Sequence, residues 1–94
     1  MVKQKVTQLM RTSVFRVEHP GEPKAYIVEL RDIYSYRTLG FESFCRVWLA
    51  SEGEQKAMEI PLEAYPKNLS KKRLAQHIVC GLVAITQWRP THED

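Results

Sequence analysis

The segment NLSKKRLAQH, residues 68–77, gathers side chains that could bind an anion at the start of a helix. Lys71, Lys72 and Arg73 fall in the expected first turn. The helix dipole places roughly half a positive charge there, which disfavours each cation by about 0.3–1 kcal/mol. Because Lys and Arg bind phosphate groups largely without regard to base sequence, we predict an anionic partner at this end of the helix.

The charge of the chain changes sign just before this segment. Residues 48–66 carry four Glu and one Lys, a net charge of −3, whereas residues 67–90 carry five Lys or Arg and no acid, a net charge of +5. The alternative to an external anion is therefore that Glu59 and Glu63 neutralise the cations. The candidate binding surface predicted here consists of Lys67, Lys71, Lys72, Arg73, Gln76 and His77.

A second group of candidate contact residues lies in LRDIYSYRTLGF, residues 30–41. Tyr34 and Tyr36 stand two positions apart, flanked by Arg31 and Arg37. Tyr and Arg are enriched in binding hot spots, and both stack on the bases of single-stranded nucleic acids. Exposure of the tyrosines on a loop would favour binding. The alternative is a strand whose tyrosine face packs on the core.

Residues able to support catalysis or hold a metal ion do not form a recognisable constellation. The sequence lacks a Gly-rich phosphate loop, an H-E-x-x-H motif, a C-x-x-C motif and a nucleophile elbow. His77 and Cys80 could supply half a metal site or a Cys–His pair, but His19 falls in a turn and His92 in the tail. We therefore predict a protein that is not an enzyme and has no metal or cofactor.

The elements expected to position these residues form an α+β fold. Residues 12–30, TSVFRVEHPGEPKAYIVEL, predict a β-hairpin that turns around Gly21. A second hairpin is expected over residues 44–64 with its turn at residues 51–54. Apolar residues between 41 and 49 also fit a helical spacing, which leaves a helix there as the alternative.

The C-terminal segment predicts one unbroken helix from about Ser70 to Arg89, roughly 30 Å long and ended by Pro90. Its buried stripe is expected to comprise Leu74, Ile78, Gly81, Leu82, Ile85 and Trp88. Packing of this helix across the two hairpins gives a small antiparallel β-sheet covered by one long helix.

The length of the chain and the pattern of its apolar residues limit the class of protein to which it can belong. The 94 residues suffice for a single domain, residues 1–94, with flexible ends expected at residues 1–5 and 91–94. No signal peptide is evident, and the longest apolar run, residues 78–85, is far shorter than the ~20 residues that span a bilayer. We expect a soluble, cytoplasmic protein that does not bind membranes and keeps Cys45 and Cys80 reduced.

The segment LAQHIVCGLVAITQW, residues 74–88, resembles the helix-turn-helix of phage Cro and repressor proteins. The matching apolar positions are Leu74, Ala75, Ile78, Cys80, Ile85 and Trp88. Val79 stands where the turn glycine is usual, and the base-facing positions hold Leu82 and Val83, which cannot hydrogen-bond to groove edges. The resemblance implies a dimeric DNA-binding repressor with two short helices that break near Cys80.

The leading hypothesis is a small non-catalytic binding protein that engages nucleic acid or a nucleic-acid-containing protein assembly, alone or as a homodimer. In size and general character it is similar to small phage-encoded regulators and inhibitors of host machinery, anti-CRISPR proteins among them. A protein-only interaction subunit is the remaining alternative. In that case Val79 and Val83 would form an interface on the outer side of the helix.

Overall fold

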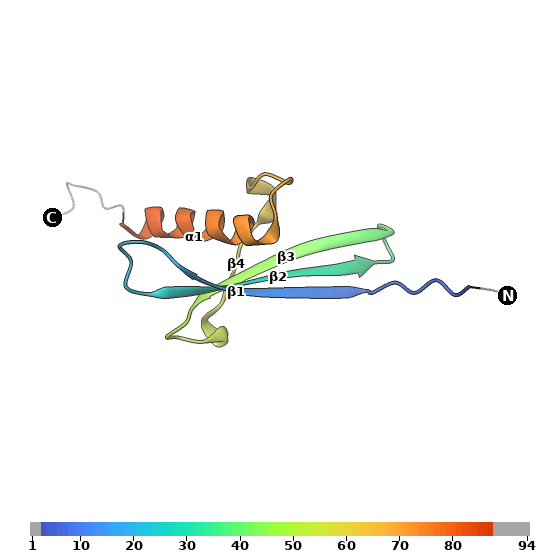
Figure 1. Cartoon of the computed structure of the whole chain (residues 1–94), viewed down its shortest axis with the longest axis horizontal. Helices are drawn as coiled ribbons and strands as arrows, with labels where there is room; N and C mark the ends of the chain where they lie inside the picture. The colour runs from blue at the N-terminus through green and yellow to red at the C-terminus, as the bar shows by residue number, and fades with distance from the viewer. Residues whose placement is uncertain (1–2, 88–94) are drawn as a thin grey trace.

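The chain folds as a β-meander followed by one helix, and a computed structural model describes its residues 3–87 (Figure 1). The elements are β1 (Met10–Glu18), β2 (Ala25–Ser35), β3 (Gly40–Leu49), the 3-10 turn η1 (Glu54–Lys56), β4 (Met58–Glu59), the 3-10 turn η2 (Leu62–Ala64) and α1 (Lys71–Gln87). The strands form one antiparallel sheet in the order β1-β2-β3-β4. The predicted α+β class is confirmed. Of the ends predicted to be flexible, residues 1–2 and 91–94 lie outside the described part of the chain.

The first hairpin forms where the sequence predicts it. β1 pairs with β2 along its whole length, and the turn between them closes where the Glu22 N–H donates to the His19 carbonyl at 3.0 Å. Gly21 takes a φ of 80°, a left-handed conformation that glycine adopts readily because it has no Cβ. Local turn chemistry therefore fixes this hairpin.

The second hairpin differs from the prediction in its partner strand. Residues 40–49 form a strand and not a helix, but β3 pairs along its length with β2, across a turn at residues 36–39. Leu39 closes this turn with a φ of 59°, and its N–H donates to the Ser35 carbonyl at 2.8 Å. A positive φ is uncommon outside glycine, so Leu39 itself gives no sign of this turn, although the Ser35 Oγ accepts the Thr38 N–H at 3.3 Å within it.

The strand expected to pair with β3 is reduced to β4, whose two residues lie opposite Arg46 and Val47. The chain on either side of β4 does not favour a long strand. Before it lie the turn-forming residues 51–53 and η1, and after it Pro61 has no N–H to donate to a ladder. Most of the outer edge of β3 is consequently unpaired within the described chain.

The helix α1 is continuous from Lys71 to Gln87. Ser70 caps its start, because the Ser70 Oγ accepts the Arg73 N–H at 3.2 Å. The expectation of two helices that break near Cys80 is wrong, and with it the helix-turn-helix interpretation. No glycine stands at the turn position, and one apolar stripe buried on the sheet runs through the segment without interruption.

One core lies between α1 and the sheet. Its buried residues are Tyr26, Val28, Leu30, Cys45, Val47, Ala75, Ile78, Val79 and Val83. Val79 is completely buried, whereas Ile85 is 71% exposed, so the buried stripe is rotated by about a quarter-turn from the prediction. The outward-facing interface expected at Val79 and Val83 is therefore wrong. Gly81 faces the Tyr65 hydroxyl instead of the sheet, and Trp88 lies outside the described residues.

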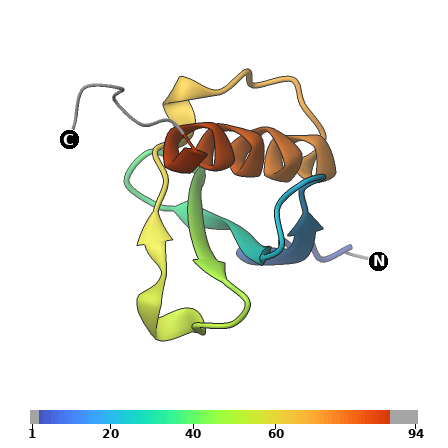
Figure 2. The same ribbon diagram turned by 90° about the vertical axis from the view of Figure 1, so that its left-hand side faces the viewer.

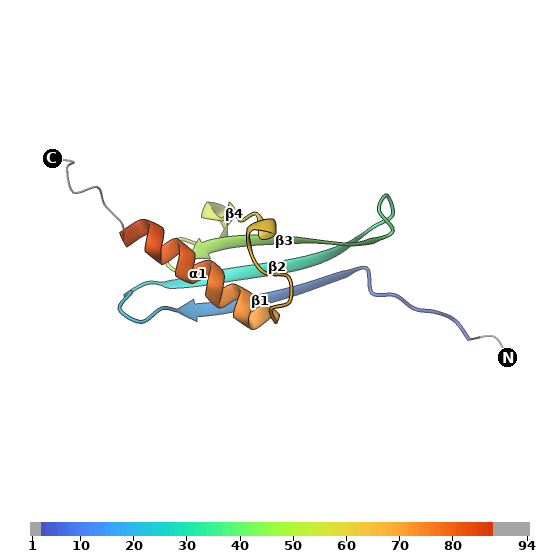
Figure 3. The same cartoon turned by 90° about the horizontal axis from the view of Figure 1, so that it is seen from above.

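The helix covers one face of the sheet and only part of its length. Figures 1 and 3 show β1, β2 and the start of β3 running on beyond the start of α1, with no described element above them. The view along the sheet places α1 on one side of the strands only (Figure 2). Within residues 3–87 no helix has the length and apolar character needed to cross a bilayer.

Candidate nucleic-acid interface

The first cation of the helix start has a partner within the chain. The Lys71 Nζ donates to the Asp32 carboxylate at 2.7 Å and so joins α1 to β2, while the Ser43 hydroxyl donates to the same carboxylate at 2.7 Å. Burial acts to raise the pKa of Asp32, but the hydrogen bonds from Lys71 and Ser43 outweigh it, and the net pKa is lowered. The sheet carboxylate, and not Glu59 or Glu63, compensates the charge of Lys71.

This contact predicts unequal roles for two neighbouring lysines. Lys71→Ala should be about 1 kcal/mol less stable than Lys72→Ala, because only the first substitution leaves the partly buried Asp32 without its cation. Loss of a cation from the first helical turn is common to both variants and cancels. Because the folded-state pKa of Asp32 is lowered, the difference should be complete above its ordinary value of 3.8 and should disappear as the pH falls further. Urea unfolding near neutral pH and near pH 3 measures both effects, and equal stabilities near neutral pH would contradict the assignment.

The other residues predicted at the helix start are exposed: Lys67, Lys72, Arg73, Gln76 and His77. Across residues 3–87 no other side chain forms a hydrogen bond or ion pair with the side chains of Lys67, Lys72 or Arg73. Lys72 and Arg73 directly follow the residue that is fixed on the sheet. Two unpaired cations therefore stand where the helix begins.

The tyrosines join an aromatic cluster on the uncovered part of the sheet. The ring centroid of Tyr34 lies 5.1 Å from that of Tyr36 and 5.5 Å from that of Phe41, both in edge-to-face geometry. The Arg11 guanidinium lies 5.1 Å from the centroid of Phe41. We call Arg11, Tyr34, Tyr36 and Phe41 the aromatic patch. Tyr34 thus belongs to a strand, yet its ring packs on other aromatic rings beyond the core, and Tyr36 is exposed in the turn.

Strand register places the aromatic patch on the same face as α1. Tyr34 lies opposite Phe41, and Asp32, two residues earlier on β2, lies opposite Arg11. Residues two apart on a strand share a face and lie about 7 Å apart. Since Asp32 holds Lys71, the start of α1 is adjacent to the patch. The structure therefore brings together the two surfaces that the sequence predicts separately.

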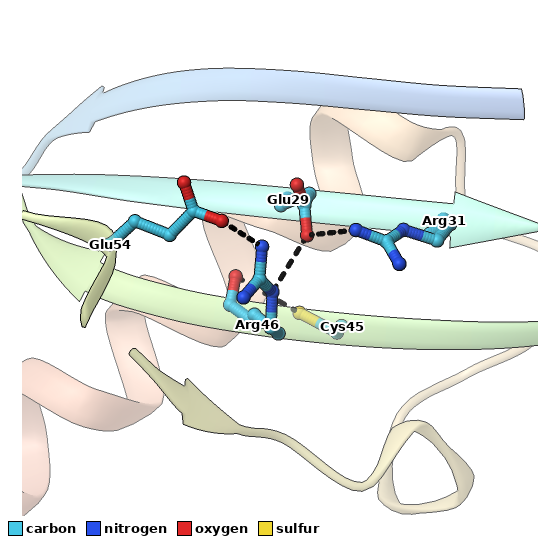
Figure 4. Close-up of polar contacts among 5 residues, drawn as sticks. All are labelled: Glu29, Arg31, Cys45, Arg46 and Glu54. Atoms are coloured by element: carbon cyan, nitrogen blue, oxygen red, sulfur yellow. Dashed lines mark hydrogen bonds and ion pairs between the residues drawn. The ribbon is translucent and has the colours of Figure 1, made fainter. Parts of the chain in front are cut away.

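The two arginines predicted beside the tyrosines separate. Arg31 lies on the opposite face, where its guanidinium donates to Glu29 at 3.3 Å, and Arg37 is exposed in the turn. Arg46 donates to Glu29 at 2.8 Å and to Glu54 at 2.6 Å, which makes a four-residue charge network (Figure 4). Period-two alternation along β2 explains why Arg31 cannot share a face with Tyr34.

The charge network compensates the cations of the opposite face. The hydrogen bond from Arg46 lowers the pKa of Glu29 most, with burial opposing it and Arg31 adding to it, and the net pKa is lowered. The acids Glu29 and Glu54 raise the pKa of Arg46 in turn. Because these acids and arginines stay ionised and neutralise one another, this face has little positive potential to attract a polyanion.

A shallow cavity of about 600 Å³ lies beside the outer edge of β3. Phe44, Ile60 and Leu62 supply apolar lining. Arg31 and Arg46 also line it but are paired with Glu29, which leaves the acids Glu59 and Glu63 in excess. Like charge disfavours phosphate at such a surface. This cavity is therefore a poorer site for nucleic acid than the aromatic patch.

The chain matches no protein-family model, no curated protein sequence and no solved structure. Three residues of the candidate interface are not predicted from the sequence: Arg11, Asp32 and Phe41. Arg11 contacts Phe41, 30 positions away, and Asp32 contacts Lys71, 39 positions away, and local sequence holds no signal for such contacts. Phe41 contacts Tyr34, seven positions earlier, across the β2–β3 turn. The alternation of β2, by contrast, could have separated Arg31 from Tyr34 once the strand was assigned.

Proposed function

We propose that the protein is a non-catalytic nucleic-acid-binding module whose ligand is a single strand lying across the aromatic patch and the start of α1. The main support for this proposal is that the exposed rings of the aromatic patch and the unpaired cations Lys72 and Arg73 lie side by side on one face of the sheet. Single-strand sites combine these two features, because bases stack on aromatic rings while cations follow the phosphates. A regulator or inhibitor of a nucleoprotein complex could contact its nucleic-acid component through the same surface.

In this proposal the parts of the ligand are bound by different residues. Tyr36 and Phe41 expose ring surface for bases, and the Arg11 guanidinium next to Phe41 adds a cation on the same face. Lys72 and Arg73 are one and two residues beyond the lysine fixed to the sheet, so their side chains can reach phosphates beside the patch. Lys71 itself holds the helix start in place.

Duplex DNA fits this surface less well than a single strand. Base readout in the major groove commonly uses a helix with polar side chains on its outer face. Here the cations are confined to the first turn of α1, and the aromatic rings lie on strands. Bases that are paired in a duplex cannot stack on those rings, so we expect a preference for single strands.

Fluorescence-anisotropy titration tests the proposal. We expect labelled single-stranded RNA or DNA to bind more tightly than duplex DNA, with affinity falling between about 50 mM and about 200 mM salt as counterions are displaced. Lys72→Glu combined with Arg73→Glu should weaken binding about five-fold and reduce the salt dependence, each lost phosphate contact contributing roughly 0.7 to the log–log slope.

A charge-matched control separates local contacts from net charge. Lys24→Glu combined with Lys56→Glu makes the same change in net charge at two exposed residues in the β1–β2 turn and in η1. This control should bind like the wild type. Equal loss in both double variants would reduce the effect to net charge, and no binding to any polynucleotide would move the proposal to a protein partner.

A further inference from the structure

Cys80 and His19 are in contact although they lie 61 positions apart in the sequence. The Cys80 Sγ lies 3.6 Å from the His19 Nε2, with the thiol on α1 and the imidazole in the turn between β1 and β2. Cys80 is exposed and His19 is half-buried. The sequence suggested His77 as the neighbour of Cys80, but the fold supplies a different histidine. The pair lies at the end of the sheet away from the aromatic patch.

The second nitrogen of His19 fixes the role of the first. The His19 Nδ1 lies 3.0 Å from the Pro20 carbonyl oxygen. A carbonyl oxygen can only accept, so Nδ1 carries the hydrogen and Nε2 of the neutral ring is left as an acceptor facing the thiol. A nucleophile, a base within reach and a group that orients the base are the three parts of an activated nucleophile.

We propose that Cys80 is a thiol–disulfide exchange site that reacts with small disulfides of low-molecular-weight thiols, with His19 as its base. The thiol proton passes to His19 Nε2 while the Cys80 sulfur attacks one sulfur of the disulfide. A new S–S bond forms to Cys80, the old S–S bond breaks, and the departing thiolate takes the proton from His19. The disulfide is the oxidant, and the products are a mixed disulfide and one free thiol.

The other cysteine provides an internal reference for this reaction. Cys45 is 3% exposed in the core, and burial, with a contribution from the charge of Glu29, raises its pKa to about 11. It should stay protonated and out of reach of a small disulfide. A metal-binding role for the Cys80–His19 pair is less well supported, since residues 3–87 contain no group of three or more His, Cys, Asp or Glu side chains placed for a metal.

The experiment treats the full chain with the aromatic disulfide 5,5′-dithiobis(2-nitrobenzoate) near neutral pH and follows the released thiolate by absorbance. We expect one fast equivalent, located on Cys80 by peptide mass spectrometry and abolished in Cys80→Ser. His19→Ala and the near-isosteric His19→Gln should each slow the reaction about five-fold or more, because neither has a base at that position. His77→Ala, the matched control three residues from Cys80 on α1, should change the rate by less than about two-fold.

The outcomes distinguish a His19 that acts as a base from a His19 that only shields the Cys80 thiol. If His19 merely shields the thiol, both His19 variants would react faster than the wild type, which would overturn the proposal. A fast adduct on Cys45, an equal effect of His77→Ala, or no reaction of the wild-type chain would overturn it as well. Unfolding of a variant would be visible in the same trace as a second reacting equivalent from Cys45, and His19→Gln then carries the comparison.

Discussion

Ile78→Ala is expected to lower the free energy of unfolding by about 2–5 kcal/mol, whereas Ile85→Ala should change it by less than about 0.5 kcal/mol. Both isoleucines lie on α1, and the sequence places both on the buried stripe. In the structure Ile78 is fully buried in the core between α1 and the sheet, while Ile85 is mostly exposed. Truncation at Ile78 removes buried methyl groups and leaves a cavity, and truncation at Ile85 leaves none.

Urea unfolding of the two variants and the wild type, followed by circular dichroism, measures this difference. The comparison is matched because both substitutions replace the same residue type within one helix, so the change in helix propensity is similar. Equal losses of stability would mean that α1 is rotated toward the orientation predicted from its sequence. A larger loss at Ile85 would contradict the packing outright.

The parts of the fold that the sequence predicts correctly are those with local causes. The first hairpin is fixed by Gly21 and its prolines, and the start of α1 is fixed by Ser70 as its cap. The β2–β3 turn has a weaker local cause, the hydrogen bond of 3.3 Å from the Thr38 N–H to the Ser35 Oγ. It closes at Leu39, whose positive φ the sequence does not predict. The long pairing of β2 with β3 on either side stabilises the turn at this position.

The face of the helix that is buried could not be predicted because two apolar stripes compete on it. A stripe through Leu74, Ile78 and Ile85 and a stripe through Ala75, Val79 and Val83 both satisfy the helical period. Which stripe is buried depends on the apolar side chains that the sheet presents to the helix. The structure buries the second stripe, with Ile78 shared by both, against Val28 and Val47.

The candidate interface combines local and long-range causes in the same way. The cations of the helix start and the tyrosine pair are visible as local clusters, and both were predicted. The contact between Lys71 and Asp32 joins residues 39 positions apart and exists only because α1 packs back on the sheet with its start within reach of β2. This contact is what turns two separate clusters into one surface, and it explains why a cation is tolerated in the first helical turn.

The role of the aromatic patch in binding can be tested with a matched pair of variants, because β3 carries two phenylalanines on opposite faces. Phe41 lies in the patch and is 41% exposed, while Phe44 lies on the other face and is 49% exposed. Stacking contributes about 1–3 kcal/mol per base, so Phe41→Ala should weaken single-strand binding by roughly 5-fold to 150-fold. Phe44→Ala, with the same chemistry and similar exposure, should leave the affinity within about two-fold.

Salt dependence distinguishes this loss from the one caused by removing cations. Phe41→Ala removes a stacking surface and no phosphate contact, so the slope of log affinity against log salt should equal that of the wild type. The Lys72→Glu and Arg73→Glu substitutions should reduce that slope instead. If Phe41→Ala and Phe44→Ala weaken binding equally, or if Phe41→Ala alters the slope, the strand does not lie on the aromatic patch, and the cations of α1 act with some other surface.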